Sequence, residues 1–109
     1  MVKAKTILFN DDLNYQASLF KALSHPARLE ILQFLAQTKS CITGDISDNL
    51  PLSRTTVNQH LKELKDSGLI VGTVSGVKTN YCLNSEKVNE VSSLLVKFFG
   101  NIKKMGNCC

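Results

Sequence analysis

Apolar side chains recur at helical spacing along much of the chain, and each such stretch predicts an amphipathic helix. A first helix is expected over residues 12–23 and a second from Pro26 to about Gln37. Between them, Ser24 has the side chain of a helix N-cap, and Pro26 suits a first turn because its missing N–H needs no partner there. The two helices are therefore expected to meet at a tight break.

A third and shorter helix is expected over residues 43–50. Thr43 has a capping side chain, and the carboxylate of Asp45 lies favourably near the positive end of a helix dipole. Pro51 follows the last turn and ends the helix. This short helix is expected to lead directly into the next one.

A fourth helix is expected to follow the cap Ser53 and to run to about Ser67. Gly68 then stands at the position where a left-handed stop is usual. The apolar stripe of this helix contains Val57, Leu61 and Leu64. Its opposite face is polar and carries Arg54, Thr55, Asn58, Gln59 and Lys62.

Two β-branched segments, residues 69–75 and 77–83, flank a Ser-Gly turn and predict a β-hairpin. A last helix is expected from the cap Ser85. Its apolar residues alternate in steps of three and four, at Val88, Val91, Leu95, Phe98 and Ile102. Residues 101–109 are expected to form a tail that carries Cys108 and Cys109.

The composition is that of one globular domain of 109 residues, with 43% hydrophobic and 20% charged residues. A formal net charge of +4 fits a polyanionic partner. The sequence has no apolar run long enough for a membrane span and no signal-peptide pattern at its start. We therefore expect a cytoplasmic protein whose four cysteines are thiols. No nucleophile motif, Gly-rich phosphate loop or paired carboxylates indicate an enzyme.

This order of elements predicts a winged helix-turn-helix over residues 1–109, a mainly α-helical α+β fold with a small β-hairpin. A helix with a polar outer face fits the major groove of DNA. Asn58 and Gln59 are suited to reading adenine, and Arg54 to guanine or a phosphate. The wing is expected to bring Lys78 to the phosphate backbone. The predicted DNA-binding residues are Ser53, Arg54, Thr55, Thr56, Asn58, Gln59, Lys62 and Lys78.

Two other interpretations of the polar helix face stay open. It is also typical of an ordinary solvated helix, and a winged helix can serve protein contacts instead of DNA. The face favours DNA because its acids, Glu63 and Asp66, lie only towards the end of the helix. His60 lies at the edge of the apolar stripe and is expected to be packed or bonded to backbone rather than to contact a base.

Three segments of the sequence resemble parts of ArsR/SmtB-type repressors. LSHPARLEILQFL resembles their second-helix signature, LSRTTVNQHLKELKDSGLI their recognition helix, and VSGVKTNYCL their wing. The resemblance covers about Leu23 to Leu83 in the same order. It implies a homodimeric cytoplasmic repressor that binds double-stranded operator DNA, with the first and last helices forming the dimer interface. The long apolar stripe of residues 88–102 agrees with pairing between chains.

Members of that family respond to metals, metalloids or redox signals, so the site must be sought in this sequence. One family site uses Asp, His and Glu on the last helix, but the two histidines here are His25 and His60. Another is a Cys-x-Cys pair at the third helix, where SCITGDI supplies Cys41 alone. Neither family site is therefore complete in this chain.

The remaining thiols suggest a different site. Cys41, Cys108 and Cys109 supply three thiolates, which trivalent arsenic or antimony prefers in a pyramidal arrangement. We expect As(III) or Sb(III) to act as inducer and DNA binding to need no cofactor. The alternatives are thiol oxidation or persulfidation, another soft metal, or no sensing by these thiols. Cys82 alternates with Tyr81 and Leu83 and is expected to point away from the face that they bury.

Overall fold

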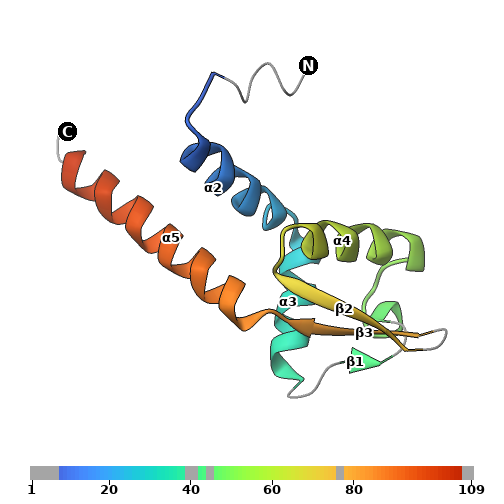
Figure 1. Cartoon of the computed structure of the whole chain (residues 1–109). Helices are drawn as coiled ribbons and strands as arrows, with labels where there is room; N and C mark the ends of the chain where they lie inside the picture. The colour runs from blue at the N-terminus through green and yellow to red at the C-terminus, as the bar shows by residue number, and fades with distance from the viewer. Residues whose placement is uncertain (1–7, 39–41, 44–45, 76–77, 107–109) are drawn as a thin grey trace.

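The computed structural model describes residues 8–38, 42–43, 46–75 and 78–106. The fold is mainly helical with a small antiparallel sheet, which confirms the predicted class (Figure 1). The elements in chain order are α2 (Asp11–Ala22), α3 (Pro26–Gln37), β1 (Ile42–Thr43), the 3₁₀ helix η1 (Ile46–Asn49), α4 (Arg54–Asp66), β2 (Ile70–Ser75), β3 (Lys78–Leu83) and α5 (Ser85–Met105).

The sheet has the strand order β1-β3-β2, so the predicted hairpin gains a third strand at one edge. Strands β2 and β3 pair from Ile70↔Leu83 to Ser75↔Lys78. Strand β1 adds the pairs Ile42↔Tyr81 and Thr43↔Asn80.

The helix expected over residues 43–50 is confirmed only in part: among the described residues it is the 3₁₀ helix η1, Ile46–Asn49. Thr43 lies in β1 rather than at a helix cap, and Asp45 lies outside the described residues. The β-branched pair Ile42 and Thr43 extends the sheet at the edge of β3, which satisfies backbone groups that a helix start would leave unpaired. Few residues then precede Pro51, and the chain forms the short 3₁₀ helix η1.

Two helix caps also differ from expectation. His25, not Ser24, is the N-cap of α3, and its Nδ1 accepts a hydrogen bond from the backbone N–H of Ala27 at 3.0 Å. The hydroxyl of Ser24 instead donates to the carbonyl of Lys21, at the end of α2. Asn84 caps α5, so Ser85 is the first helical residue. Helix α5 continues through Gly100 to Met105, and residues 101–105 of the expected tail are therefore helical.

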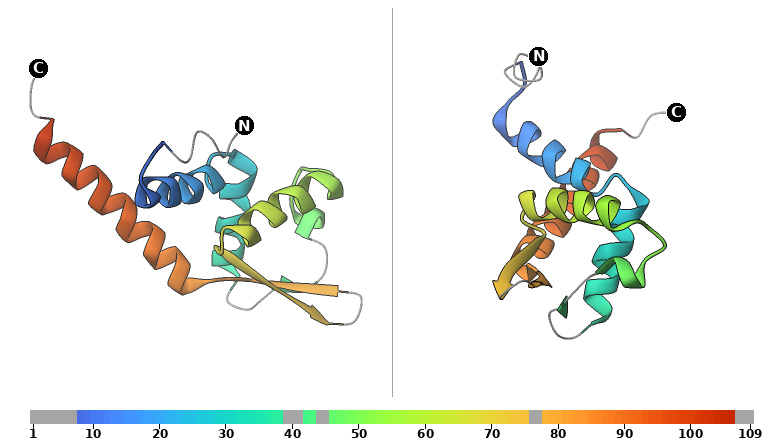
Figure 2. Two further views of the ribbon diagram at one scale, coloured as in Figure 1. Left: turned by 45° about the horizontal axis from the view of Figure 1, so that its top comes forward. Right: turned by 90° about the vertical axis from the view of Figure 1, so that its right-hand side faces the viewer.

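The core joins the sheet and most of the helices. Its most completely buried side chains come from α2, α3, η1, α4 and β2, and they are Leu19, Ile31, Ile46, Val57, Leu64 and Ile70. Burying each one contributes about 1.5–3 kcal/mol to the free energy of folding. Helix α5 extends well beyond this body (Figures 1 and 2). Its one fully buried residue is Val91.

Candidate nucleic-acid interface

Helix α4 begins and ends where the sequence predicts. The hydroxyl of Ser53 accepts a hydrogen bond from the backbone N–H of Thr56 at 3.2 Å, which satisfies one of the N–H groups left open at a helix start. At the other end, Gly68 has a φ of +87°, a left-handed conformation that glycine adopts without strain. Local signals at both ends therefore fix the length of this helix.

The two faces of α4 differ as an interface requires. Val57, His60, Leu61 and Leu64 are buried towards the core. The predicted reading residues Arg54, Thr55, Asn58 and Gln59 are exposed, and so is Lys62. Figure 1 shows α4 lying along the outside of the body, next to the β2–β3 hairpin. The structure thus presents the predicted side chains on one outer helix face.

Some of these side chains already have partners. The hydroxyl of Ser53 also donates to Oγ1 of Thr56 at 2.9 Å, so both residues take part in capping. The ammonium of Lys62 bonds Asp66 one turn later at 3.0 Å. This carboxylate raises the pKa of Lys62 through the hydrogen bond and the charge. Lys62 therefore stays cationic at neutral pH, and its charge can attract a polyanion such as DNA.

The hairpin runs back alongside α4 and projects from the body in the manner of a wing (Figure 2). Lys78 is the first residue of β3, and its backbone pairs with Ser75 at the open end of the hairpin. The side chain of Lys78 lies outside what the structure describes. The backbone position is the one that the sequence predicts for a residue at the wing tip.

A cluster of ionisable groups behind α4 was not predicted. The rings of His25 and His60 are in contact, with centroids 4.2 Å apart. His60 is 8% exposed, which confirms the expected packed position. Arg28 of α3 lies beside Glu63 of α4, with Nη1 and Oε2 3.8 Å apart. The sequence signal was present: His60 lies three residues after Val57 and four before Leu64, on the same face of the helix.

The cysteine prediction needs one correction. Cys82 is disulfide-bonded, whereas all four cysteines were expected to be thiols. The pairing of β3 with β1 brings together segments that are distant in the sequence. The alternation of apolar residues around Cys82 gives no sign of such long-range contacts. The proposed ligands Cys41, Cys108 and Cys109 lie outside the described residues. Within the described ranges, no group of three or more His, Cys, Asp or Glu could hold a metal ion.

The segment that follows α4 contacts the start of α5. The backbone N–H of Asn84, the cap of α5, donates to the carbonyl of Leu69 at 2.9 Å. A Cβ at Gly68 would lie 3.0 Å from Cε of Lys87, so the missing side chain makes room for the first turn of α5. These two contacts fix the position of the first turn of α5 relative to the segment that follows α4.

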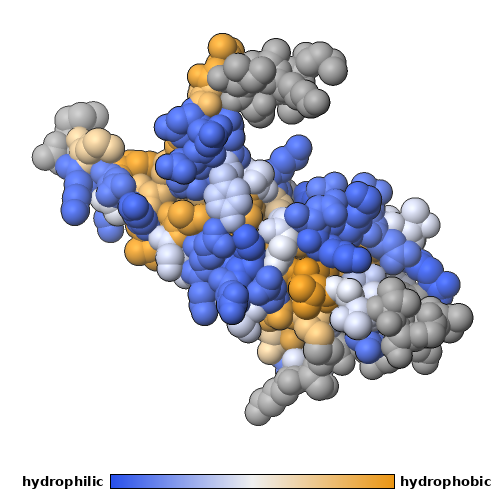
Figure 3. Space-filling model, in the orientation of Figure 1, coloured by the Kyte–Doolittle hydropathy of each residue, from blue (hydrophilic) through white to orange (hydrophobic). Residues whose placement is uncertain are grey.

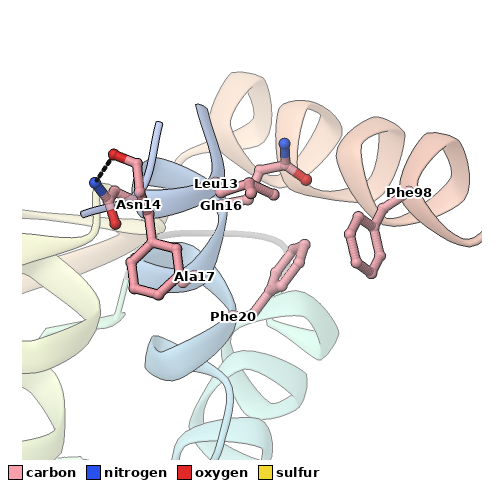
Figure 4. A pocket seen from close by; sticks show the side chains of 7 residues that line it. Leu13, Asn14, Gln16, Ala17, Phe20 and Phe98 are labelled. Carbon is pink, nitrogen blue, oxygen red and sulfur yellow. Dashed lines mark hydrogen bonds between the residues drawn. The ribbon is translucent and has the colours of Figure 1, made fainter. Parts of the chain in front are cut away.

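An apolar groove of about 450 Å³ separates α2 from the far part of α5. Phe20 and Phe98 approach each other across it in an edge-to-face arrangement, with centroids 6.3 Å apart (Figure 4). Apolar surface gathers between the two helices in the space-filling view (Figure 3). Along α5, Val96 is 72% and Phe99 56% exposed. A patch of this kind is typical of a protein–protein interface.

A capped helix with a polar outer face, followed by a two-stranded wing, defines the winged helix-turn-helix class of DNA-binding proteins. Residues 25–71 match the bacterial regulatory proteins of the arsR family. The chain is 35% identical over 90 residues to the arsenical resistance operon repressor of Bacillus subtilis, covering 83% of this chain and 86% of that protein. The chain belongs to the ArsR family, whose members are DNA-binding transcriptional regulators.

Solved structures agree with the assignment. An ArsR-like transcriptional regulator from Rhodococcus sp. RHA1 has a TM-score of 0.72 and 25% identity, covering 88% of this chain and 90% of that one. A homodimeric winged helix-turn-helix DNA-binding domain from Mycobacterium bovis has a TM-score of 0.63 and 26% identity, covering 83% and 82%. No helix in the described part of this chain has the length and hydrophobicity to cross a membrane.

Proposed function

We propose that this chain is a cytoplasmic, homodimeric repressor that binds double-stranded operator DNA through α4 and is released by trivalent arsenic or antimony. The observation that carries the DNA-binding part is the outer face of α4, where polar side chains stand opposite a buried apolar stripe. Asn58 and Gln59 offer amides for adenine, and Arg54 a guanidinium for guanine or phosphate.

Contacts with phosphates set the position of α4 in the groove. Ser53, Thr55 and Thr56 lie at the N-terminal end of the helix, where open N–H groups and hydroxyls suit a phosphate. Lys62 and Lys78 add positive charge on the helix and at the wing. Each phosphate neutralised releases counterions, and binding should therefore weaken steeply as salt is raised.

Dimerisation is supported by the exposed apolar side chains of α2 and α5. Leu13, Val96, Phe99, Ile102 and Met105 are between 42% and 76% exposed in the single chain. Packing this surface against a second copy removes it from water and places two copies of α4 at related positions. The homodimeric relative from Mycobacterium bovis has the same fold.

The inducer follows from cysteine chemistry. Trivalent arsenic takes three soft thiolate ligands, and Cys41, Cys108 and Cys109 supply that number. Cys41 precedes β1 and η1, which lead into α4, so a ligand held there acts close to the reading helix. The Bacillus subtilis relative is an arsenical resistance operon repressor, which supports the same inducer class.

Thiol oxidation is the second candidate signal, and the disulfide bond of Cys82 favours it. Two thiols would lose two electrons and two protons to hydrogen peroxide, which is reduced to two molecules of water while the S–S bond forms. A disulfide that included Cys41 would remove this thiol from the arsenic site, so the two signals would then compete.

The decisive experiment is fluorescence anisotropy of the reduced protein on labelled duplex from upstream of its own gene. Arsenite, zinc and hydrogen peroxide are titrated in parallel. Release at near-stoichiometric arsenite, abolished in Cys108→Ser/Cys109→Ser, is the expected result. Normal release from that double variant overturns the ligand assignment. Release by peroxide alone, abolished in Cys82→Ser, supports the oxidation candidate instead.

A further inference from the structure

The contact between His25 and His60 joins two elements with different tasks. His25 caps α3, and its Nδ1 is occupied by the N–H of Ala27. His60 lies on the buried face of the reading helix α4. The two rings meet at 4.2 Å with an interplanar angle of 44°. The position of α4 against the start of α3 therefore depends on this pair.

The surroundings of His60 suit a neutral ring and not a charged one. Its Nδ1 is buried and has no hydrogen-bond partner among the described residues. Nε of Arg28, on α3, is in the same condition. A buried imidazolium needs acceptors for both N–H groups, and here it would meet a guanidinium instead. A proton on His60 would thus introduce a charge that these neighbours oppose.

The net effect of the groups around His60 is to lower its pKa. Burial, then His25 and then Arg28 lower the pKa of His60 below its usual 6.5, while Glu63 on α4 opposes them. Of the other elements that pack on α4, β2 has no titratable side chain, and Asp48 of η1 is exposed. In the unfolded chain the ring gains its proton near pH 6.5, and stability is therefore lost as the pH falls from there towards the lowered value.

We propose that the His25–His60 contact positions α4 for DNA and is opened by protonation of His60, so that operator affinity falls on acidification. The DNA part rests on the proposed function. An ordinary exposed histidine near phosphates has the opposite effect, since its charge attracts the polyanion and strengthens binding at low pH. The sign of the pH dependence therefore distinguishes a buried positioning contact from a surface charge.

The test compares the intact chain with two variants between pH 7.5 and 5.5, at constant ionic strength. His60→Leu removes the titrating ring and keeps an apolar side chain in its place. His25→Asn keeps a good N-cap and removes the ring contact. Each is measured by thermal unfolding and by anisotropy on duplex from upstream of its gene. The ring protons are followed by NMR, which is simple because the chain has two histidines.

We expect His60 to titrate below pH 6.5, and the operator affinity to fall by up to about tenfold per pH unit for each protomer, or about a hundredfold for the dimer, the limit for one proton and for two. The profile of His60→Leu should be flatter in both unfolding and DNA binding, and His25→Asn should raise the pKa of His60. Titration of His60 at or above 6.5, or parallel profiles for the intact chain and His60→Leu, overturns the inference. Should His60→Leu fail to fold, His60→Gln takes its place. Normal pH-dependent unfolding without DNA binding at any pH overturns the proposed function instead.

Discussion

The phenolic hydroxyl of Tyr15 on α2 donates a hydrogen bond to Oε2 of Glu90 on α5, at 2.5 Å. Lys87 completes the arrangement, since its ammonium lies 2.8 Å from the same hydroxyl and 3.1 Å from Oε1 of Glu90. Three side chains thus fix α2 against the first turns of α5. This link holds the two helices that carry most of the exposed apolar surface.

Tyr15→Phe should lower the melting temperature by about 2–5 °C, because the hydroxyl is lost and the ring is kept. The hydrogen bond from Tyr15, then that from Lys87, lowers the pKa of Glu90 below its usual 4.5. The stabilisation is therefore present above that value and is lost as the pH falls through the lowered one. Melting curves at pH 7 and pH 3 should show the difference between the two proteins shrinking on acidification. Glu90→Gln keeps an acceptor without a charge and should remove that pH dependence. If the differences in melting temperature between the parent, Tyr15→Phe and Glu90→Gln are the same at both pH values, the assignment is contradicted.

Ser53→Ala should reduce the free energy of unfolding by about 0.5–2 kcal/mol, because the cap of α4 is lost. Ser53→Asn supplies another side-chain oxygen and should keep most of the stability. Urea unfolding of both variants measures the difference. Equal losses in the two variants would mean that the capping bond to Thr56 contributes little.

Asn58→Ala should leave unfolding within about 0.5 kcal/mol of the parent, because the side chain is exposed. Its operator affinity should fall by about 1–3 kcal/mol if the amide reads a base. Anisotropy on the operator and on a scrambled duplex separates the two effects. A loss of the same size on both duplexes argues against base reading by Asn58.

Lys62→Ala should weaken binding to operator and scrambled DNA alike and reduce the salt slope by about 1 for each protomer, or about 2 for the dimer. Unfolding should change little, since the ion pair with Asp66 is exposed. Lys65→Ala is the matched control, as this lysine lies on the same helix outside the predicted interface. Salt titrations that give the same slope for both variants rule out a phosphate contact by Lys62.

Phe99→Lys should shift the chain from dimer to monomer in sedimentation velocity, because it places a charge in the exposed apolar face of α5. Leu29→Lys is the control, since Leu29 is 47% exposed but lies on α3. The control should sediment as the parent does. A Phe99→Lys protein that stays dimeric places the interface elsewhere.

The parts of the fold with local signals were predictable from the sequence. Helix α4 carries its own cap at Ser53 and its own stop at Gly68, and both ends lie where expected. Strand β1 was missed because it exists through pairing with β3, and Ile42 lies far from Tyr81 in the sequence. A two-residue strand has too little alternation of its own to be recognised.

In the candidate site, too, features with a local sequence signal were predictable and features that depend on long-range contacts were not. The outer face of α4 follows from helical periodicity, which places Gln59 opposite Val57 and Leu61 and Asn58 beside them. The sequence did not distinguish Ser24 from His25 as the cap of α3, since both precede Pro26; in the structure His25 caps the helix, and its ring also contacts His60. The bonded state of Cys82 likewise depends on a contact between distant segments.

The backbone hydrogen bond between Asn84 and Leu69 links the start of α5 to the segment that follows α4, so a small rotation there moves the far end of α5 by a larger distance. Helix α5 has 21 residues and is about 30 Å long. A rotation of about 5° where Asn84 meets Leu69 would displace its far end by about 3 Å over that length. In a dimer held together through α5, the same rotation is transmitted in reverse to both copies of α4. The distance between the two reading helices is then set by a hinge that touches no DNA.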